Sequence, residues 1–373
     1  MIFEVKLPGN WDEVIVNTKS RYRSEERVDN QPRNLAQTIE TLERTVRLSY
    51  NDISRKRAEA IAWACIGLLD IYALLLDEGV NEIIASRIGE PLVVTHSKYG
   101  RCLTNLRLGT NLWNALKNRA EFDTGEALTP LTPALKAGFE TDIGSIRLSM
   151  QTTPLAPDGP TFTIRRLPKK SFTLTDLISQ NQIKEQEGRF LLHQLARRAN
   201  IIIAGEPGSG KTTLANALLK ESEKSWRLIV IEDAREIRFE SKEFPLLTRY
   251  SMPAVGSDSR ARNRAEEIAR MLHRSPDYVF LGEIQNKDDT KAALEAFAAG
   301  IRGMATTHGR DIDGLIARWE LSHGLSHDLL RVIDIVVMTR REIIDGRSKL
   351  SVDAIYRSMK DGKKFLGFKE VSP

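Results

Sequence analysis

The octapeptide GEPGSGKT at residues 205–212 constrains this 373-residue chain more than any other feature, because it fits the pattern G-x-x-x-x-G-K-[ST]. It follows the apolar run NIIIA, which is typical of a buried strand, and it precedes TLANALLK, which is typical of a helix. In such a strand–loop–helix unit the glycines let the backbone curve tightly, so that its N–H groups point at phosphate oxygens. The sequence therefore predicts a phosphate-binding loop with a nucleoside triphosphate as its ligand.

Two side chains of this loop have predictable tasks. The Lys211 ammonium would reach the β and γ phosphates, and the Thr212 hydroxyl would ligate Mg²⁺. We therefore expect ATP and Mg²⁺ as the cofactors. The candidate nucleotide-binding residues are Gly205, Glu206, Pro207, Gly208, Ser209, Gly210, Lys211, Thr212 and Thr213.

The sequence after about residue 173 predicts a mostly parallel sheet covered by helices, because strand-like apolar runs alternate there with helical segments. The expected strands are residues 200–205, 227–233 and 277–283, and the expected helices are residues 211–222, 261–273 and 288–300. A hairpin is expected around Asp345-Gly346, between two final strands. This domain is expected to span residues 173–373.

The sequence before it predicts a smaller α+β domain at residues 61–168. A helix is expected over about residues 57–76, and short strands are expected within residues 81–86, 91–108, 142–151 and 161–167. Residues 1–60 are polar and rich in charge, and residues 20–34 show no periodicity. We therefore expect a polar N-terminal extension over residues 1–60.

Composition excludes several protein classes. The 55 Lys+Arg nearly balance the 50 Asp+Glu, so the net charge of +5 supports nucleic-acid binding only weakly. Two cysteines, Cys65 and Cys102, exclude a disulfide framework and a four-cysteine zinc site. The most apolar run, residues 61–76, is too short for a membrane span and contains Asp70, and the N-terminus has no secretory signal pattern. We therefore expect a soluble, cytoplasmic protein that can dock on a membrane protein.

Acidic residues end two of the predicted strands. Glu232 and Asp233 close one strand, and Glu283 closes another. Ligands bind at the carboxyl ends of the strands in an open α/β sheet, so a carboxylate placed there can orient an attacking water. A single acidic residue at a strand end more often caps the next helix. Two such sites after a phosphate loop favour catalysis, with Thr212 and Glu283 as the candidate metal-binding residues.

This ordered series of segments resembles the ATPases of type II and type IV secretion systems and of type IV pilus assembly, in particular their archaeal branch. The Walker A segment, Asp box, Walker B segment and His box of that family correspond to residues 205–219, 230–237, 275–290 and 293–311. The resemblance implies an α/β fold, in which a RecA-like P-loop NTPase domain follows a smaller α+β N-terminal domain.

The resemblance also assigns roles to five residues outside the phosphate loop. Glu232 and Glu283 would position water, and His308 would lie near the γ-phosphate. Arg147 and Arg165, in segments that resemble the family's N-terminal domain, would contact nucleotide across a domain or subunit boundary.

Gly282 agrees with the family's Walker B segment, in which Gly replaces the usual Asp before the catalytic Glu. Three features depart from the family pattern. His273 and Gln285 stand where the family usually has arginine. The four-cysteine zinc module of many bacterial members is also missing from this sequence. The loss of two expected arginines implies that subunit contacts and turnover differ from the family norm.

By resemblance, the chain is a hexameric motor ATPase that powers assembly of a type IV pilus-like filament or protein secretion. It would work at the inner face of the cell membrane with a polytopic membrane platform protein, and nucleic acid is not expected as a partner. Two alternatives stay open. A RecA-like nucleic-acid translocase or helicase would be stimulated by DNA or RNA. A regulatory nucleotide-binding module, suggested by His273 and Gln285, would not turn over.

Overall fold

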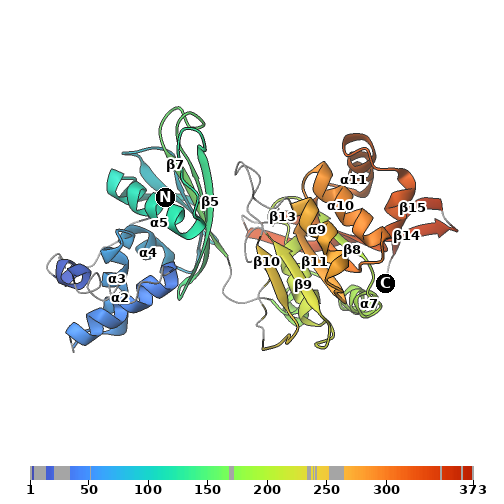
Figure 1. The fold of residues 1–373 in the computed structure, drawn as a ribbon, viewed down its shortest axis with the longest axis horizontal. Coiled ribbons are helices and arrows are strands. Elements are labelled where there is room, and N and C mark those ends of the chain that lie inside the picture. The colour runs from blue at the N-terminus through green and yellow to red at the C-terminus, as the bar shows by residue number, and fades with distance from the viewer. Residues whose placement is uncertain are drawn as a thin grey trace. The chain divides into compact units, whose positions relative to one another are not determined.

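The computed structural model describes residues 2–3, 14–20, 34–50, 52–167, 172–232, 237, 239, 242–251, 264–344, 347–362 and 364–371. These residues form two compact units, one up to residue 167 and one from residue 172 onward (Figure 1). Each unit has its own sheet and its own hydrophobic core.

The described part of the first unit contains a seven-stranded sheet in the order β1-β4-β3-β2-β7-β6-β5, antiparallel except for the pair β1–β4. Buried and exposed residues alternate along these strands, so one face of the sheet packs on the hydrophobic core. The strands are β1 (Ile2–Phe3), β2 (Val80–Ala85), β3 (Pro91–His96), β4 (Gly100–Arg107), β5 (Ala134–Thr141), β6 (Gly144–Gln151) and β7 (Thr161–Leu167). The helices are α2 (Leu35–Ser49), α3 (Arg55–Cys65), α4 (Leu69–Leu75) and α5 (Thr110–Thr124), and residues 14–20 are also helical.

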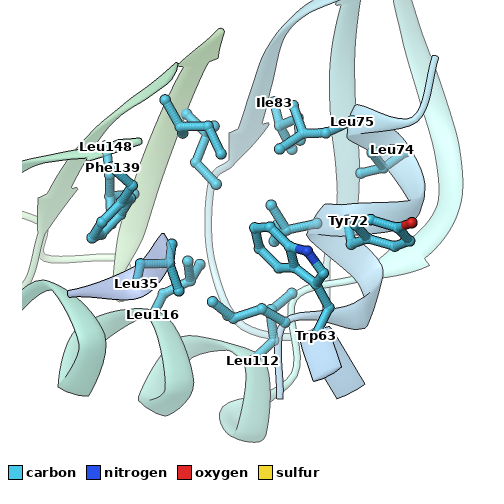
Figure 2. Packing of buried hydrophobic residues seen from close by; sticks show 14 of the residues in the cluster. Leu35, Trp63, Tyr72, Leu74, Leu75, Ile83, Leu112, Leu116, Phe139 and Leu148 are labelled. Carbon is cyan, nitrogen blue, oxygen red and sulfur yellow. The ribbon is translucent and has the colours of Figure 1, made fainter. Parts of the chain in front are cut away.

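Helix α2 belongs to the core of this unit. Its capping box pairs Asn34 with Gln37, and its apolar stripe buries Leu35, Leu42 and Val46 (Figure 2 labels Leu35 in this cluster). The prediction of a polar extension over residues 1–60 is therefore wrong for the described residues 34–50 and 52–60. The polar residues between the apolar positions hid a helical stripe that faces the core. Residues 21–33, which make up most of the stretch without periodicity, lie outside the described residues.

The single helix predicted over residues 57–76 is also wrong, because the chain turns at Gly67. Gly67 has φ 77°, a left-handed conformation that ends α3, and the Leu68 N–H donates to the Trp63 carbonyl at 3.0 Å. Helix α4 then folds back, so that the rings of Trp63 and Tyr72 stack with centroids 5.5 Å apart (Figure 2). The long apolar run thus forms two short buried helices. Among the described helices, none is both long and apolar enough to cross a membrane.

The described part of the second unit contains an eight-stranded sheet in the order β10-β9-β11-β12-β8-β13-β14-β15. Neighbours from β10 to β13 pair in parallel, and β13, β14 and β15 pair antiparallel. The strands are β8 (Ile201–Gly205), β9 (Leu228–Glu232), β10 (Thr248–Ser251), β11 (Tyr278–Glu283), β12 (Gly303–His308), β13 (Ile335–Ile344), β14 (Arg347–Asp361) and β15 (Lys364–Val371). The helical elements are α6 (Leu174–Ser179), α7 (Glu185–Ala196), α8 (Lys211–Lys220), α9 (Arg264–Arg270), α10 (Lys287–Ala298), α11 (Ile312–Ala317), η1 (Met271–His273), η2 (Arg318–Ser322) and η3 (His327–Val332).

Helices cover both faces of this sheet, which explains the continuous apolar runs of its strands (Figure 1). Ile201 and Ile203 of β8 pack with residues of α6–α8, whereas Ile202 packs with residues of α9–α11. The strands and helices predicted here are confirmed, as is the final antiparallel pair of strands. The expected turn at Asp345-Gly346, and the start of the helix predicted from residue 261, lie outside the described residues.

Shortening Leu42 tests whether α2 belongs to the folded core. Leu42 is 2% exposed, so Leu42→Ala should lower the free energy of unfolding by about 2–5 kcal/mol. Leu48 on the same helix is 62% exposed, and Leu48→Ala should change that free energy by about 0.5 kcal/mol or less. Urea denaturation followed by circular dichroism compares the two variants. Equal, small effects would mean that α2 does not contribute to the core.

Candidate nucleotide-binding site

Four predicted site residues lie at one edge of the second sheet. The parallel strands β8, β12, β11 and β9 end at Gly205, His308, Glu283 and Glu232, respectively. In the register of β8 and β12, Gly205 lies opposite His308. The carboxyl ends of parallel strands are the usual ligand-binding edge of an open sheet, so the topology brings the phosphate loop and the candidate catalytic residues to one place.

The phosphate loop has a backbone that requires its glycines. Gly208 and Gly210 have φ 74° and 88°, a region that disfavours other residues. A Cβ on Gly205 would lie 2.3 Å from Thr339 Oγ1 and 2.5 Å from Ser209 Oγ, so no larger residue fits there. The Ser209 and Thr339 hydroxyls hydrogen-bond each other at 2.8 Å, which ties the loop to β13. Gly210 caps α8, so the loop surrounds the positive end of a helix dipole.

Lys211 lies inside this loop and is only 7% exposed. Its Nζ donates to the Gly205 carbonyl at 3.0 Å and to the Glu206 carbonyl at 2.9 Å, and it lies 3.3 Å from His308 Nδ1. An ammonium can only donate, and two carbonyl oxygens and an imidazole nitrogen lie within reach of its N–H groups. The loop thus holds a buried cation at the point where the phosphates of a nucleotide are expected.

The imidazole of His308 links this cation to Glu283. Because the Lys211 ammonium can only donate, Nδ1 of His308 accepts, and the other ring nitrogen of the neutral imidazole carries the proton. That nitrogen, Nε2, lies 2.7 Å from Glu283 Oε1. The second oxygen of Glu283, Oε2, accepts from Gln285 Nε2 at 2.7 Å. The structure therefore brings together Lys211, His308 and Glu283, as the sequence predicts, and adds Gln285.

Glu232 ends β9, which is separated from β12 in the sheet by β11. Glu232 is only 6% exposed. Its Oε2 accepts a hydrogen bond from the Ile237 N–H at 3.0 Å, so this carboxylate anchors the chain after β9. Asp233, the other acidic residue predicted at this strand end, lies outside the described residues.

Close approach of β9 to β11 explains why Gly282 precedes Glu283. Gly282 has φ 59°, and a Cβ there would lie 2.7 Å from the carbonyl oxygen of Ile231. A residue with a side chain does not fit this backbone.

Arg318 belongs to the same region but was missed by the sequence analysis. It begins the π-helical turn η2, and its Nη2 donates to Thr307 Oγ1 at 2.6 Å. Thr307 Oγ1 in turn donates to the Ile284 carbonyl at 2.9 Å, next to Glu283. Burial lowers the pKa of the Arg318 guanidinium, and the charge of Glu283 opposes that shift. A π-helical turn often marks a functional site, but no sequence pattern announces one.

Arg147 and Arg165 belong to the first unit, where they lie directly opposite each other on β6 and β7. Ile146 and Leu148, on either side of Arg147, are buried in the core, so both arginines lie on the other face of the sheet. Arg165 pairs with Glu82 at 3.2 Å across β2 and β7. Glu82 and Arg147 thus flank Arg165 on the two neighbouring strands.

The residues present fit a nucleotide with Mg²⁺. The left-handed glycines leave room for phosphate against the loop, and the buried Lys211 ammonium matches its charge. The Thr212 hydroxyl and a Glu283 oxygen are hard ligands of the kind that Mg²⁺ prefers, and Mg²⁺ usually takes its remaining ligands from phosphates and water. Within the described residues, no group of three or more His, Cys, Asp or Glu side chains could hold a metal without such help.

Comparison with known proteins identifies the family. Residues 101–345, more than half of the chain, match the family model described as "Type II/IV secretion system protein". The chain belongs to this family. The family has an archaeal member of similar sequence: the uncharacterized protein MJ0781 of Methanocaldococcus jannaschii is 31% identical over 229 residues, which cover 60% of this chain and 31% of that protein.

A second relative, the type IV secretion system protein PtlH of Bordetella pertussis, is 32% identical over 170 residues, which cover 42% of this chain and 50% of PtlH. The chain thus spans half or less of the length of both relatives.

Two solved structures share the fold. The Legionella pneumophila ATPase DotB has a TM-score of 0.54 at 19% identity, and the match covers 74% of this chain and 77% of the DotB chain. The pilus retraction motor PilT with bound ADP has a TM-score of 0.57 at 20% identity, covering 76% and 81%. The predicted fold class is confirmed.

Adding a methyl group at Gly282 tests the close approach of the strands. Gly282→Ala should destabilise the chain by about 3 kcal/mol or more, because the left-handed backbone and the contact with the Ile231 carbonyl both oppose a Cβ. Gly300→Ala is the control, since Gly300 also has a positive φ but nothing within 4 Å of its Cβ position. Thermal unfolding measures both variants, and equal losses would contradict the argument.

The pH dependence of the melting temperature tests the environment of His323, whose pKa is influenced by Arg318. Burial, Arg318 and Lys287 lower the pKa of His323, which is only 7% exposed, below its ordinary value of 6.5. A histidine of lowered pKa stabilises the fold fully above its unfolded pKa, and this contribution is lost as the pH falls below that value. The melting temperature should therefore fall between about pH 7.5 and about pH 5.5.

The melting temperature of the variant His323→Leu should fall less over this pH interval than that of the wild type. His193 is exposed on α7, so His193→Gln serves as the control and should follow the wild-type curve. Parallel curves for His323→Leu and the wild type would show that His323 does not carry this pH dependence.

Proposed function

We propose that this protein hydrolyses ATP with Mg²⁺ at the edge formed by β8, β12 and β11, and that hydrolysis drives a pilus-like or secretion machine. The connected series Lys211, His308 and Glu283 is the observation that supports this proposal most strongly, because it joins a phosphate-binding cation to a carboxylate. Membership of the Type II/IV secretion system protein family supports the same function.

In the proposed reaction, the chain's own residues bind the phosphates, orient water and take up a proton. Lys211 and the loop N–H groups hold the β and γ phosphates. Thr212 and Glu283 would hold Mg²⁺, which neutralises phosphate charge when bound. Glu283, assisted by Glu232, orients the attacking water and accepts its proton on a carboxylate oxygen. His308 keeps Glu283 in place by donating from Nε2.

Arg147 and Arg165 would serve the same reaction from the first unit. Their paired positions place two guanidinium groups on one sheet face, from which both would donate to a phosphate group. Contact with nucleotide across a domain or subunit boundary would couple the movement of the first unit to the hydrolytic cycle.

We further propose that the motor is a homohexamer at the inner face of the cell membrane, where it acts on a polytopic membrane platform protein. Membership of the Type II/IV secretion system protein family is consistent with this arrangement. Added DNA or RNA should leave the rate of hydrolysis unchanged, in contrast to a nucleic-acid translocase.

Removing the Lys211 ammonium tests the phosphate site. Lys211→Ala should lower ATP hydrolysis by about 100-fold or more, because the loop then has no cation for the β and γ phosphates. Lys220 ends the same helix, and Lys220→Ala should hydrolyse at the wild-type rate. A phosphate-release assay compares the variants. Near wild-type hydrolysis by Lys211→Ala would exclude this site.

Neutralising Glu283 tests the catalytic carboxylate separately. Glu283→Gln should lower kcat by about 100-fold or more while ATP binding stays within about threefold, because the amide cannot accept the proton of water. Glu295→Gln, on the exposed surface of α10, is the matched control. Isothermal titration calorimetry gives the affinity. Loss of ATP binding in Glu283→Gln would indicate a structural role instead.

A further inference from the structure

Gln285 donates a hydrogen bond to Glu283, and the proposed function gives this side chain no task. Its Nε2 donates to Glu283 Oε2 at 2.7 Å, and His308 Nε2 meets the other oxygen of the same carboxylate, Oε1, at 2.7 Å. Both carboxylate oxygens therefore have a nitrogen donor, one from β12 and one from the loop after β11. Two bonds to different oxygens restrict rotation of the carboxylate plane, which one bond alone does not.

The backbone before Gln285 is fixed by the sheet. Ile284 is fully buried, its N–H donates to the Thr306 carbonyl at 2.8 Å, and its carbonyl accepts from Thr307 Oγ1 at 2.9 Å. Thr307 is itself held by the guanidinium of Arg318 at 2.6 Å. Ile284, which links Glu283 to Gln285, is thus anchored through both its N–H and its C=O group.

The backbone after Gln285 is fixed by a helix cap. The Asn286 side chain accepts from the Asp289 N–H at 2.8 Å and begins α10. Gln285 itself is exposed. Its side chain nevertheless starts from a rigid Cα, so that the bond to Glu283 costs only the entropy of its own rotamers.

We propose that Gln285 is a positioning residue for Glu283, which holds Oε2 while His308 holds Oε1; this role rests on the proposed ATP hydrolysis. Gln285 thus aims the carboxylate through the N–H group of its amide.

Removing the donor without changing the size or charge of the side chain tests this role. Gln285→Met should lower kcat about tenfold, which corresponds to one hydrogen bond to a charged group, while KM changes by about twofold or less. ADP affinity, measured by calorimetry, should not change, because Gln285 acts on Glu283 and not on the nucleotide. Gln186→Met, at an exposed position of α7, is the matched control and should keep the wild-type kcat.

Two further variants separate positioning from a structural role. Gln285→Arg keeps N–H donors at this position and should recover most of the kcat that Gln285→Met loses. In the Glu283→Gln background, Gln285→Met should cause no further loss of kcat, because the group that it positions is no longer a base.

Three results would overturn the role of Gln285: wild-type kcat in Gln285→Met, a loss of ADP affinity along with kcat, or the same tenfold loss in the Glu283→Gln background. The wild-type chain is assayed first. A wild type without ATP hydrolysis would overturn the proposed function and the role of Gln285 with it, whereas an active wild type with any of these three results overturns the role of Gln285 alone.

Discussion

The parallel pairing of β8 with β12, with Gly205 opposite His308, is the constraint on which the rest of the candidate site depends. Ile201, Ile202 and Ile203 of β8 are all fully buried, with side chains that alternate between the two faces of the sheet. Helices therefore enclose β8 on both faces and hold it inside the sheet. The register in turn sets the phosphate loop beside the end of β12, which is what allows Lys211 to reach His308.

The polar groups at this edge form a connected series that begins at a buried ammonium. A buried ammonium is costly unless it is bonded, and Lys211 meets this need with two carbonyl oxygens and an imidazole nitrogen. The imidazole can accept from Lys211 only while it stays neutral, and its remaining N–H is then directed to Glu283. The orientation of each member therefore depends on its neighbour.

Much of this arrangement was predictable from the sequence, because it follows from local rules. The glycines of the loop, the apolar strand before it and the helix after it predicted the phosphate site, and the strand ends predicted Glu232 and Glu283. Features that depend on spacing in three dimensions were not predictable. Helix α2 was hidden by polar residues between its buried positions, and the turn at Gly67 by the apolar residues around it. The hydrogen bond from Gln285 to Glu283 depends on the rotamers of both side chains. The hydrogen bond from Arg318 to Thr307 depends on a π-helical turn.

Gly282 and Gln285 flank the Glu283–Ile284 pair, and each constrains Glu283 in a different way. β9 approaches β11 so closely that a side chain at position 282 would meet the Ile231 carbonyl. Glycine at this position therefore lets Glu283 lie directly beside the end of β9. On the other side, Gln285 stands where the family usually has arginine, and its amide donates to Glu283 Oε2. The close packing of the strands thus fixes the backbone of Glu283, and the amide directs its carboxylate.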